Sequence, residues 1–199
     1  MTGTYGASLV SKSFWFVEFK KIVKLVSEGK TEQEIKHLCI EENLFGAKRE
    51  YRAKEIYSGV IRRIRKLDEP LFQIFLTADI GTQKLINFII IVQGDRLFFE
   101  FLYEVYREKI ILGQKEMTQF DLNTFFSQKE TQSKKVEEIK DITKKRLGTS
   151  YFNFMINANL LTVVGTKKMI TPPIIDLRLE KYLEKTGWTA LFKAIKGVG

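Results

Sequence analysis

Residues 160–171 read Leu-Leu-Thr-Val-Val-Gly-Thr-Lys-Lys-Met-Ile-Thr, and their pattern decides the fold class. Between Asp141 and Ala158 apolar residues recur at helical spacing, but beyond Asn159 the pattern becomes extended. Two β-type runs around a turn that contains glycine predict a hairpin, which Pro172-Pro173 ends. The sequence therefore predicts a helix followed directly by two antiparallel strands.

Two more helices are predicted before this one. The run from Thr118 to Asp121 can cap a helix whose apolar residues include Phe120, and Ser133 can cap a short helix through Ile139. Asp141 then caps the helix that leads into the hairpin. Three helices followed by a hairpin is the order of a winged helix-turn-helix, in which the last helix reads DNA and the hairpin is the wing.

The rest of the chain is also predicted to be helical. Thr31 and Glu34 have the spacing of a capping box, and Asp68-Glu69-Pro70 is typical of a helix start. The further helices are expected over residues 13–27, 31–43, 48–67, 71–77, 82–92, 95–113 and 176–185. We therefore predict a mainly α protein with an N-terminal helix-turn-helix-like bundle over residues 1–68, a central helical core over 69–116, and a C-terminal winged-helix-like module with a short β-hairpin over 117–199.

The composition limits the chemistry that this chain can perform. Its 199 residues are 44% hydrophobic and carry 33 Lys and Arg against 24 Asp and Glu, for a net charge of +9. One histidine, His37, and one cysteine, Cys39, cannot close a tetrahedral zinc shell, and a single thiol forms no internal disulfide. The longest apolar run, residues 85–92, is less than half of the roughly 20 residues of a membrane span. The N-terminus carries no signal peptide, so we expect a cytoplasmic protein. From the residue counts and the short apolar run we also expect no metal, no cofactor and no membrane span.

Two patterns resemble enzyme motifs, and neither has the context that its chemistry requires. Gly29-Lys30-Thr31 looks like the end of a phosphate-binding loop, but the glycine needed five residues earlier is replaced by Lys24. Glu-x-Lys pairs, as in many metal-dependent nucleases, begin at Glu18, Glu34 and Glu138. All three pairs lie in helical pattern rather than on a strand beside another acid. We therefore expect no enzymatic activity.

The positive charge is concentrated in three places. Eight basic residues crowd the predicted helix at 48–67, a second cluster spans residues 134–146, and a lysine pair lies at the tip of the predicted hairpin. Such clusters suit a phosphate backbone, because bound Lys and Arg release its condensed counterions. The candidate DNA-binding residues are Lys48, Arg49, Arg52, Arg62, Arg63, Lys66, Lys134, Lys135, Lys140, Thr143, Lys144, Lys145, Arg146, Lys167 and Lys168.

A helix that starts at Asp141 would present Thr143, Lys144 and Lys145 from its first turn, where a reader helix enters the major groove. The wing lysines would hold neighbouring phosphates. Nothing in the sequence requires contacts to specific bases. Because basic runs are also ordinary solvated faces, three alternatives stay open: docking of an acidic protein partner, binding of RNA, and metal-dependent nuclease activity.

Several short stretches of the sequence occur in the order and at the spacing of a known protein family. No single stretch is specific to that family. The stretches are Glu28-Gly29-Lys30, Glu42-Asn43-Leu44-Phe45, Asp95-Arg96-Leu97-Phe98-Phe99-Glu100-Phe101, Tyr106-Arg107-Glu108-Lys109, Phe125-Phe126, Gln132-Ser133, and Leu160-Leu161 before Pro172-Pro173. Together they span nearly the whole chain and resemble the small BrxA-type proteins of bacterial BREX phage-exclusion systems.

This resemblance implies a non-enzymatic, all-helical DNA-binding component of an anti-phage defence operon, acting beside separate methyltransferase and ATPase proteins. It supplies no catalytic residues. With the charge pattern, it leads us to expect binding of double-stranded DNA, mainly through phosphates, with other proteins of the defence system as further partners. The alternative is a protein–protein scaffold or adaptor, or an RNA-binding protein, within a defence complex.

Overall fold

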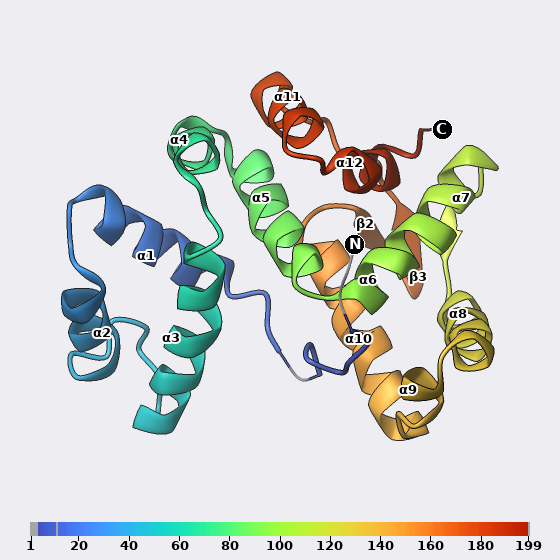
Figure 1. Ribbon diagram of the computed structural model, residues 1–199, viewed down its shortest axis with the longest axis horizontal. Coiled ribbons are helices and arrows are strands. Elements are labelled where there is room, and N and C mark those ends of the chain that lie inside the picture. Colours follow the sequence, from blue (N-terminus) through green and yellow to red (C-terminus); the bar gives the residue numbers. More distant parts are fainter. Residues whose placement is uncertain (1–3, 11, 199) are drawn as a thin grey trace. The chain divides into compact units, whose positions relative to one another are not determined.

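A computed structural model describes residues 4–10 and 12–198 of the chain (Figure 1). Its elements are mostly helices, with a small three-stranded antiparallel sheet towards the C-terminus. This confirms the prediction of a mainly α protein with a hairpin after the helix that begins near Asp141. The chain divides into two compact units: unit 1 comprises Met1–Phe14 and Asp79–Gly199, and unit 2 comprises Trp15–Ala78.

Unit 2 consists of α1 (Phe16–Ser27), α2 (Glu32–Ile40), α3 (Glu50–Ile64) and α4 (Glu69–Thr77). The predicted capping box is present at α2, where the hydroxyl of Thr31 accepts from the Glu34 amide and the Glu34 carboxylate accepts from the Thr31 amide at 2.8 Å. Asp68 caps α4 in the same way, by accepting from the Leu71 amide. Helix α3 packs against both α1 and α2 and so forms the centre of this unit.

Unit 1 contains the remaining elements. They are α5 (Ile80–Gln93), α6 (Arg96–Phe101), the π-helical turn η1 (Leu102–Tyr106), α7 (Arg107–Ile111), β1 (Glu116–Met117), α8 (Gln119–Gln132), α9 (Lys134–Glu137), α10 (Asp141–Asn157), β2 (Leu161–Val164), β3 (Lys167–Ile170), α11 (Leu177–Lys185) and α12 (Thr189–Lys196). The predicted cap of α8 is confirmed as a full capping box between Thr118 and Asp121.

The core of unit 1 is aromatic. Phe98 stacks on Tyr151 with ring centroids 4.3 Å apart and meets Phe88 edge to face at 5.5 Å. Phe101 meets Phe125 edge to face at 5.3 Å. Aromatic rings bury large areas and prefer these offset and edge-on geometries. These contacts join α6 to α5, α8 and α10, so the central helices hold the C-terminal helices in place.

The predicted hairpin is present at residues 161–170. Strands β2 and β3 pair antiparallel from Leu161↔Ile170 to Val164↔Lys167, which leaves Gly165 and Thr166 as a two-residue loop. Gly165 has φ 60°, a left-handed conformation that favours glycine. The short strand β1, which the sequence pattern does not reveal, adds to the other side of β3, so the strand order is β1-β3-β2.

Three predicted helices differ in the structure. The helix expected over residues 95–113 is interrupted by the π-helical segment η1. The extra residue in this wider turn directs the Tyr106 side chain into the core, where its hydroxyl donates to the Leu160 carbonyl. Asp141 is not the N-cap of α10: Lys140 occupies that position, and Asp141 is the first helical residue. The first helix begins at Phe16 rather than residue 13, because Trp15 has φ 45°.

Two further expectations were wrong. Helix α12 was missed, although Leu191, Phe192 and Ile195 lie buried at helical spacing. Phe120 was expected on the apolar side of its helix but is 75% exposed, because the buried face of α8 is formed by residues 122, 125 and 126.

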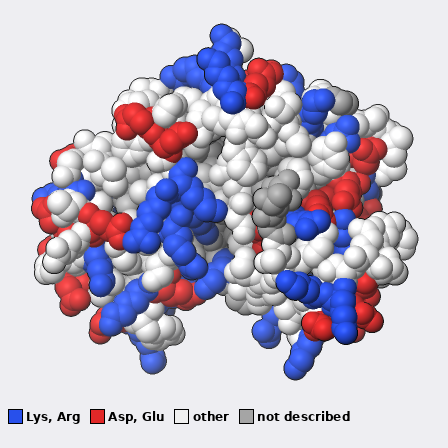
Figure 2. All heavy atoms as spheres, viewed as in Figure 1, with Lys and Arg blue, Asp and Glu red and all other residues white. Residues whose placement is uncertain are grey.

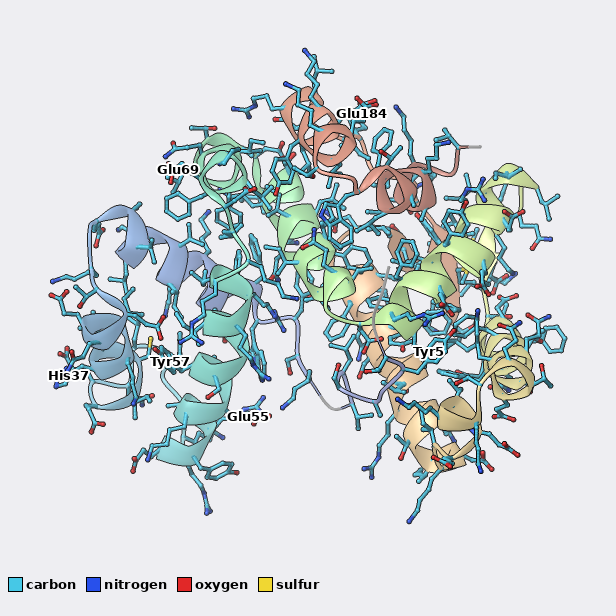
Figure 3. The ribbon with its side chains drawn as sticks, in the orientation of Figure 1. Tyr5, His37, Glu55, Tyr57, Glu69 and Glu184 are labelled. Carbon is cyan, nitrogen blue, oxygen red and sulfur yellow. The ribbon has the colours of Figure 1, made fainter. Side chains whose placement is uncertain are left out.

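The segment around Tyr5 is bound to the rest of unit 1 through polar contacts. Figure 3 marks the position of Tyr5. Its hydroxyl donates to the Glu100 carboxylate at 2.9 Å, and the Arg96 guanidinium lies over its ring. Glu100 also pairs with Arg96 and with the buried Lys129, whose ammonium contacts Glu104 as well. We call Tyr5, Arg96, Glu100, Glu104 and Lys129 the Glu100 cluster.

The division into compact units groups the chain differently from the three predicted segments. Residues 69–78 belong with the N-terminal helices, and residues 79–116 belong with the C-terminal helices. The aromatic contacts between α6 and α10 account for the second grouping. Separate roles for residues 1–68, 69–116 and 117–199 stay a prediction. Among the described residues, no helix is both long and apolar enough to cross a membrane.

Candidate nucleic-acid interface

The basic residues predicted to bind DNA on α3 and just beyond its ends fall into two groups. Lys48, Arg49, Arg62 and Lys66 are exposed, whereas Arg52 is half-buried and Arg63 is buried. Figure 2 shows lysine and arginine side chains gathered where α3 ends. The exposed group can reach a ligand of unit 2 without rearrangement.

Arg52 and Arg63 pack on an aromatic ring. Their guanidinium carbons lie 5.7 and 5.4 Å from the centroid of Trp15, within the range of cation–π attraction. Arg52 also forms an ion pair with Glu55 at 2.6 Å. Burial, followed by the charge of Arg62, lowers the pKa of Arg63 to about 10, so Arg63 remains a cation at neutral pH. These two arginines stabilise unit 2, and the sequence pattern could not distinguish them from the exposed group.

The Trp15 ring leaves no room for a side chain at Gly59. A Cβ atom there would lie 2.3 Å from Cζ3 of Trp15. We expect Gly59→Ala to destabilise the protein by about 1–3 kcal/mol through overpacking, although alanine favours a helix by about 1 kcal/mol over glycine. Denaturant unfolding measures this change, and Ser58→Ala, at the adjacent exposed position of α3, is the matched control. Equal stability of Gly59→Ala and the parent protein would contradict this packing.

The second group of predicted residues surrounds α9 and the start of α10. Lys134, Lys135, Lys140, Lys145 and Arg146 are all exposed, and we call these five residues the α9–α10 basic cluster. Thr143 is half-buried beside them, and the acids Glu137 and Glu138 lie between them on the surface. No ion pair joins any of the five to an acid within residues 4–10 and 12–198.

Lys144 has a different environment from its neighbours. It is 8% exposed, and its ammonium pairs with Glu130 at 2.6 Å and with Asp141 at 3.5 Å. Although burial opposes its charge, these two carboxylates hold the pKa of Lys144 above its usual value. The side chain is thus engaged inside unit 1 rather than presented to a ligand.

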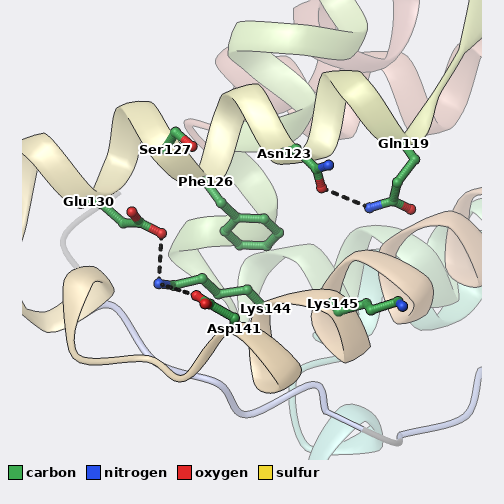
Figure 4. Close-up of a pocket in the computed structure, with 8 residues that line it drawn as sticks. All are labelled: Gln119, Asn123, Phe126, Ser127, Glu130, Asp141, Lys144 and Lys145. Atoms are coloured by element: carbon green, nitrogen blue, oxygen red, sulfur yellow. Dashed lines mark hydrogen bonds and ion pairs between the residues drawn. The ribbon is translucent and has the colours of Figure 1, made fainter.

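A cavity of about 440 Å³ opens between α8 and the first turns of α10 (Figure 4). Its floor holds Phe126 and the Lys144–Glu130 ion pair. Gln119 and Asn123 hydrogen-bond to each other along its α8 wall, and Lys145 lies on the α10 side. Seven of its eight lining residues are polar or charged.

The two lysines at the tip of the β2–β3 hairpin are both partly engaged. Lys167 remains exposed but lies 3.6 Å from the Glu116 carboxylate on β1. Lys168 is half-buried, with its ammonium 4.9 Å from the ring centroid of Phe152 on α10. At the tip of the hairpin, Lys167 is the lysine that can still reach a phosphate.

The structure also exposes polar residues of α10 that were not among the predicted contacts. Thr149 and Asn153 lie on the solvent side of the helix. Both residues lie outside the apolar stripe of the helix, and this position predicts that they are exposed. The prediction of binding residues was based on charge, so these uncharged side chains were not included.

The family model for BrxA matches residues 3–187 of the chain. The chain belongs to the BrxA family, whose members are part of the BREX phage-defence system. It is 34% identical over 183 residues to the BREX protein BrxA of Bacillus cereus (strain H3081.97), and the match covers 92% of each chain. The family resemblance stated from the sequence is thereby confirmed.

One solved structure has the same fold as this BrxA family chain. It is the crystal structure of an uncharacterized protein from Magnetospirillum magneticum, with a TM-score of 0.78 over 98% of this chain and 100% of that chain. The two sequences are only 18% identical, so this likeness concerns the fold alone.

Proposed function

We propose that this BrxA family protein is a non-enzymatic, double-stranded DNA-binding component of the BREX phage-defence system, and that it holds the duplex mainly through phosphates. The observation that carries the proposal is the α9–α10 basic cluster, five exposed cations with no acid paired to them in the described part of the chain. Lys144 and Arg63 are left out of the proposed contacts because they are buried.

The topology around the cluster supports this proposal. In unit 1, α7, β1, α8, the single-turn helix α9, α10, β2 and β3 follow one another, and the strand order is β1-β3-β2. This is the order of a winged helix-turn-helix, in which α10 would be the reader helix and the β2–β3 hairpin the wing. The same reasoning assigns unit 2 a helix-turn-helix-like role, with Arg49, Arg62 and Lys66 as a second set of phosphate contacts.

The positions of three lysines in the sequence of α9 and α10 support a role in phosphate binding rather than in stabilising the fold. Lys134 and Lys135 open α9, and Lys140 is the N-cap of α10. The N-terminus of a helix carries partial positive charge, so cations there are locally unfavourable. A phosphate ligand would instead be attracted both by the lysines and by the free amides at the helix start.

A salt titration tests the proposal. Five phosphate contacts predict a slope of about −4.5 for the logarithm of the association constant against the logarithm of salt concentration, because each contact contributes about −0.9. The measurement is fluorescence anisotropy with labelled random-sequence duplex between 50 and 300 mM NaCl. Absence of duplex binding at low salt would overturn the proposal and favour docking of an acidic protein partner.

Two parallel experiments test RNA binding and nuclease activity. Competition between duplex DNA and structured RNA of equal length distinguishes the two nucleic acids, and we expect duplex DNA to compete at least as well. Incubation of supercoiled DNA with the protein and Mg²⁺ or Mn²⁺ should leave the DNA intact. Nicked or linear product that depends on the protein would identify a nuclease instead.

A further inference from the structure

The outer face of α10 carries a row of exposed side chains that the fold does not use, and of these only Arg146 is also one of the proposed phosphate contacts. At 3.6 residues per turn, Ile142, Arg146, Thr149 and Asn153 fall within an arc of about 60°. Ile142 is 57% exposed, and the other three are also exposed. The buried residues Leu147, Tyr151, Phe154 and Met155 lie on the other side of the helix. We call the four exposed residues, Ile142, Arg146, Thr149 and Asn153, the α10 row.

The chemistry of the α10 row matches base edges better than phosphates. Only Arg146 is charged, so the row as a whole would bind a phosphate backbone weakly. In the major groove, by contrast, arginine pairs with guanine, asparagine pairs with adenine, and an apolar group contacts the methyl of thymine. Threonine can serve either kind of base.

The polar groups of the row are available for such contacts. The Thr149 hydroxyl donates to the Lys145 carbonyl at 3.0 Å, which leaves its oxygen free to accept. The side-chain amide of Asn153 has no hydrogen bond to any residue that the structure describes, so both its donor and its acceptor can face a base. Adenine offers the complementary pair at N6 and N7.

Charge and length favour duplex DNA as the occupant of this face. Helix α10 contains no acidic residue after Asp141, so nothing on the row would repel a groove lined by phosphates. Lys145 and Lys140 flank its N-terminal end. From Ile142 to Asn153 the helix rises about 17 Å, which corresponds to about five base pairs at 3.4 Å each.

We propose that the α10 row reads DNA sequence in the major groove, with Arg146 facing guanine, Asn153 facing adenine and Ile142 facing a thymine methyl. This inference rests on the proposed duplex binding and goes beyond it, because phosphate contacts alone carry no sequence information. It moves Arg146 from a phosphate to a base, so the four lysines of the α9–α10 basic cluster then predict a salt slope of about −3.6. It predicts a preferred site of about five base pairs in which Asn153 sets one adenine position.

Selection of bound duplexes from a randomised pool at 150 mM salt, followed by sequencing, tests the inference. We expect the parent protein to enrich a motif, and Thr149→Ala/Asn153→Ala to lose about tenfold of the discrimination at one adenine position. The matched control is Thr131→Ala/Gln128→Ala, which removes a threonine and an amide side chain at exposed positions of α8 away from the cavity. Thr131 bonds back to the main chain as Thr149 does. Thermal unfolding confirms that the parent protein and both double variants are folded.

The outcomes distinguish this inference from the proposed function. A steep salt dependence without any enriched motif overturns sequence reading while leaving phosphate binding intact. A motif that survives Thr149→Ala/Asn153→Ala, or that is lost equally in the α8 control, places the reading elsewhere and also overturns it. No duplex binding at any salt concentration removes both.

Discussion

Changing Lys134, Lys135 and Lys140 together to glutamate is expected to lower the affinity for duplex DNA of every sequence by about 500-fold at 0.1 M salt. Each phosphate contact contributes about 0.9 logarithmic units at that salt concentration, and three contacts are lost. The salt slope should fall by about 2.7 in magnitude for the same reason. Fluorescence anisotropy over a salt series measures both quantities.

The fold should tolerate this triple change. All three side chains are exposed, and Lys140 is the N-cap of the 17-residue helix α10, where an acidic residue is favoured by about 0.3–1 kcal/mol. Lys20, Lys181 and Lys185 provide the control, since they are also exposed lysines and their reversal changes the net charge equally. If the control loses as much affinity, binding depends on overall charge, and the α9–α10 basic cluster is not a site.

Lys129→Met is expected to destabilise the protein by about 3 kcal/mol, because it leaves two carboxylates of the Glu100 cluster without their buried cation. The Lys129 side chain is 4% exposed, and its ammonium lies 2.7 Å from Glu100 and 2.5 Å from Glu104. Removing one partner of a buried pair typically costs about 3–5 kcal/mol, and the exposure of Glu104 places this case at the lower end. Denaturant unfolding measures the loss, with Lys181→Met as an exposed control.

The same variant should change the pH dependence of stability. Burial raises the pKa of Glu100, while hydrogen bonds from Lys129, Arg96 and Tyr5 lower it, and the net shift is downward from 4.5. A lowered carboxyl pKa stabilises the fold above pH 4.5, and that stabilisation is lost as the pH falls below it. Lys129→Met should therefore lose less stability than the parent protein between pH 5 and pH 3. An unchanged pH profile would show that the ion pair is unimportant.

Local signals explain what the sequence predicted correctly. The capping box of Thr31 and Glu34, the cap at Asp68 and the turn at Gly165 depend on residues within four positions of each other, so each can be recognised along the chain. The order of helices and hairpin follows from such signals, and so does the family resemblance.

Contacts between distant residues explain what was missed. Lys144 and Lys145 are adjacent and identical in type, but only Lys144 is buried, because α8 brings Glu130 to it. In the same way Arg63 is buried by Trp15, 48 positions earlier in the chain. Charge clustering therefore located the candidate interface but could not separate its exposed cations from structural ones.

The chain begins in unit 1, leaves it after Phe14 and returns at Asp79, which sets an order for events during synthesis. The whole of unit 2 emerges from the ribosome before the partners of the first residues exist. Asn87 donates to the Phe14 carbonyl, Ser8 donates to Asp95, and Tyr5 donates to Glu100, so these contacts close loops of 73 to 95 residues. Loops of that length slow folding. Residues 15–78 can therefore fold first, while the opening segment waits for the aromatic helices of unit 1 to be translated.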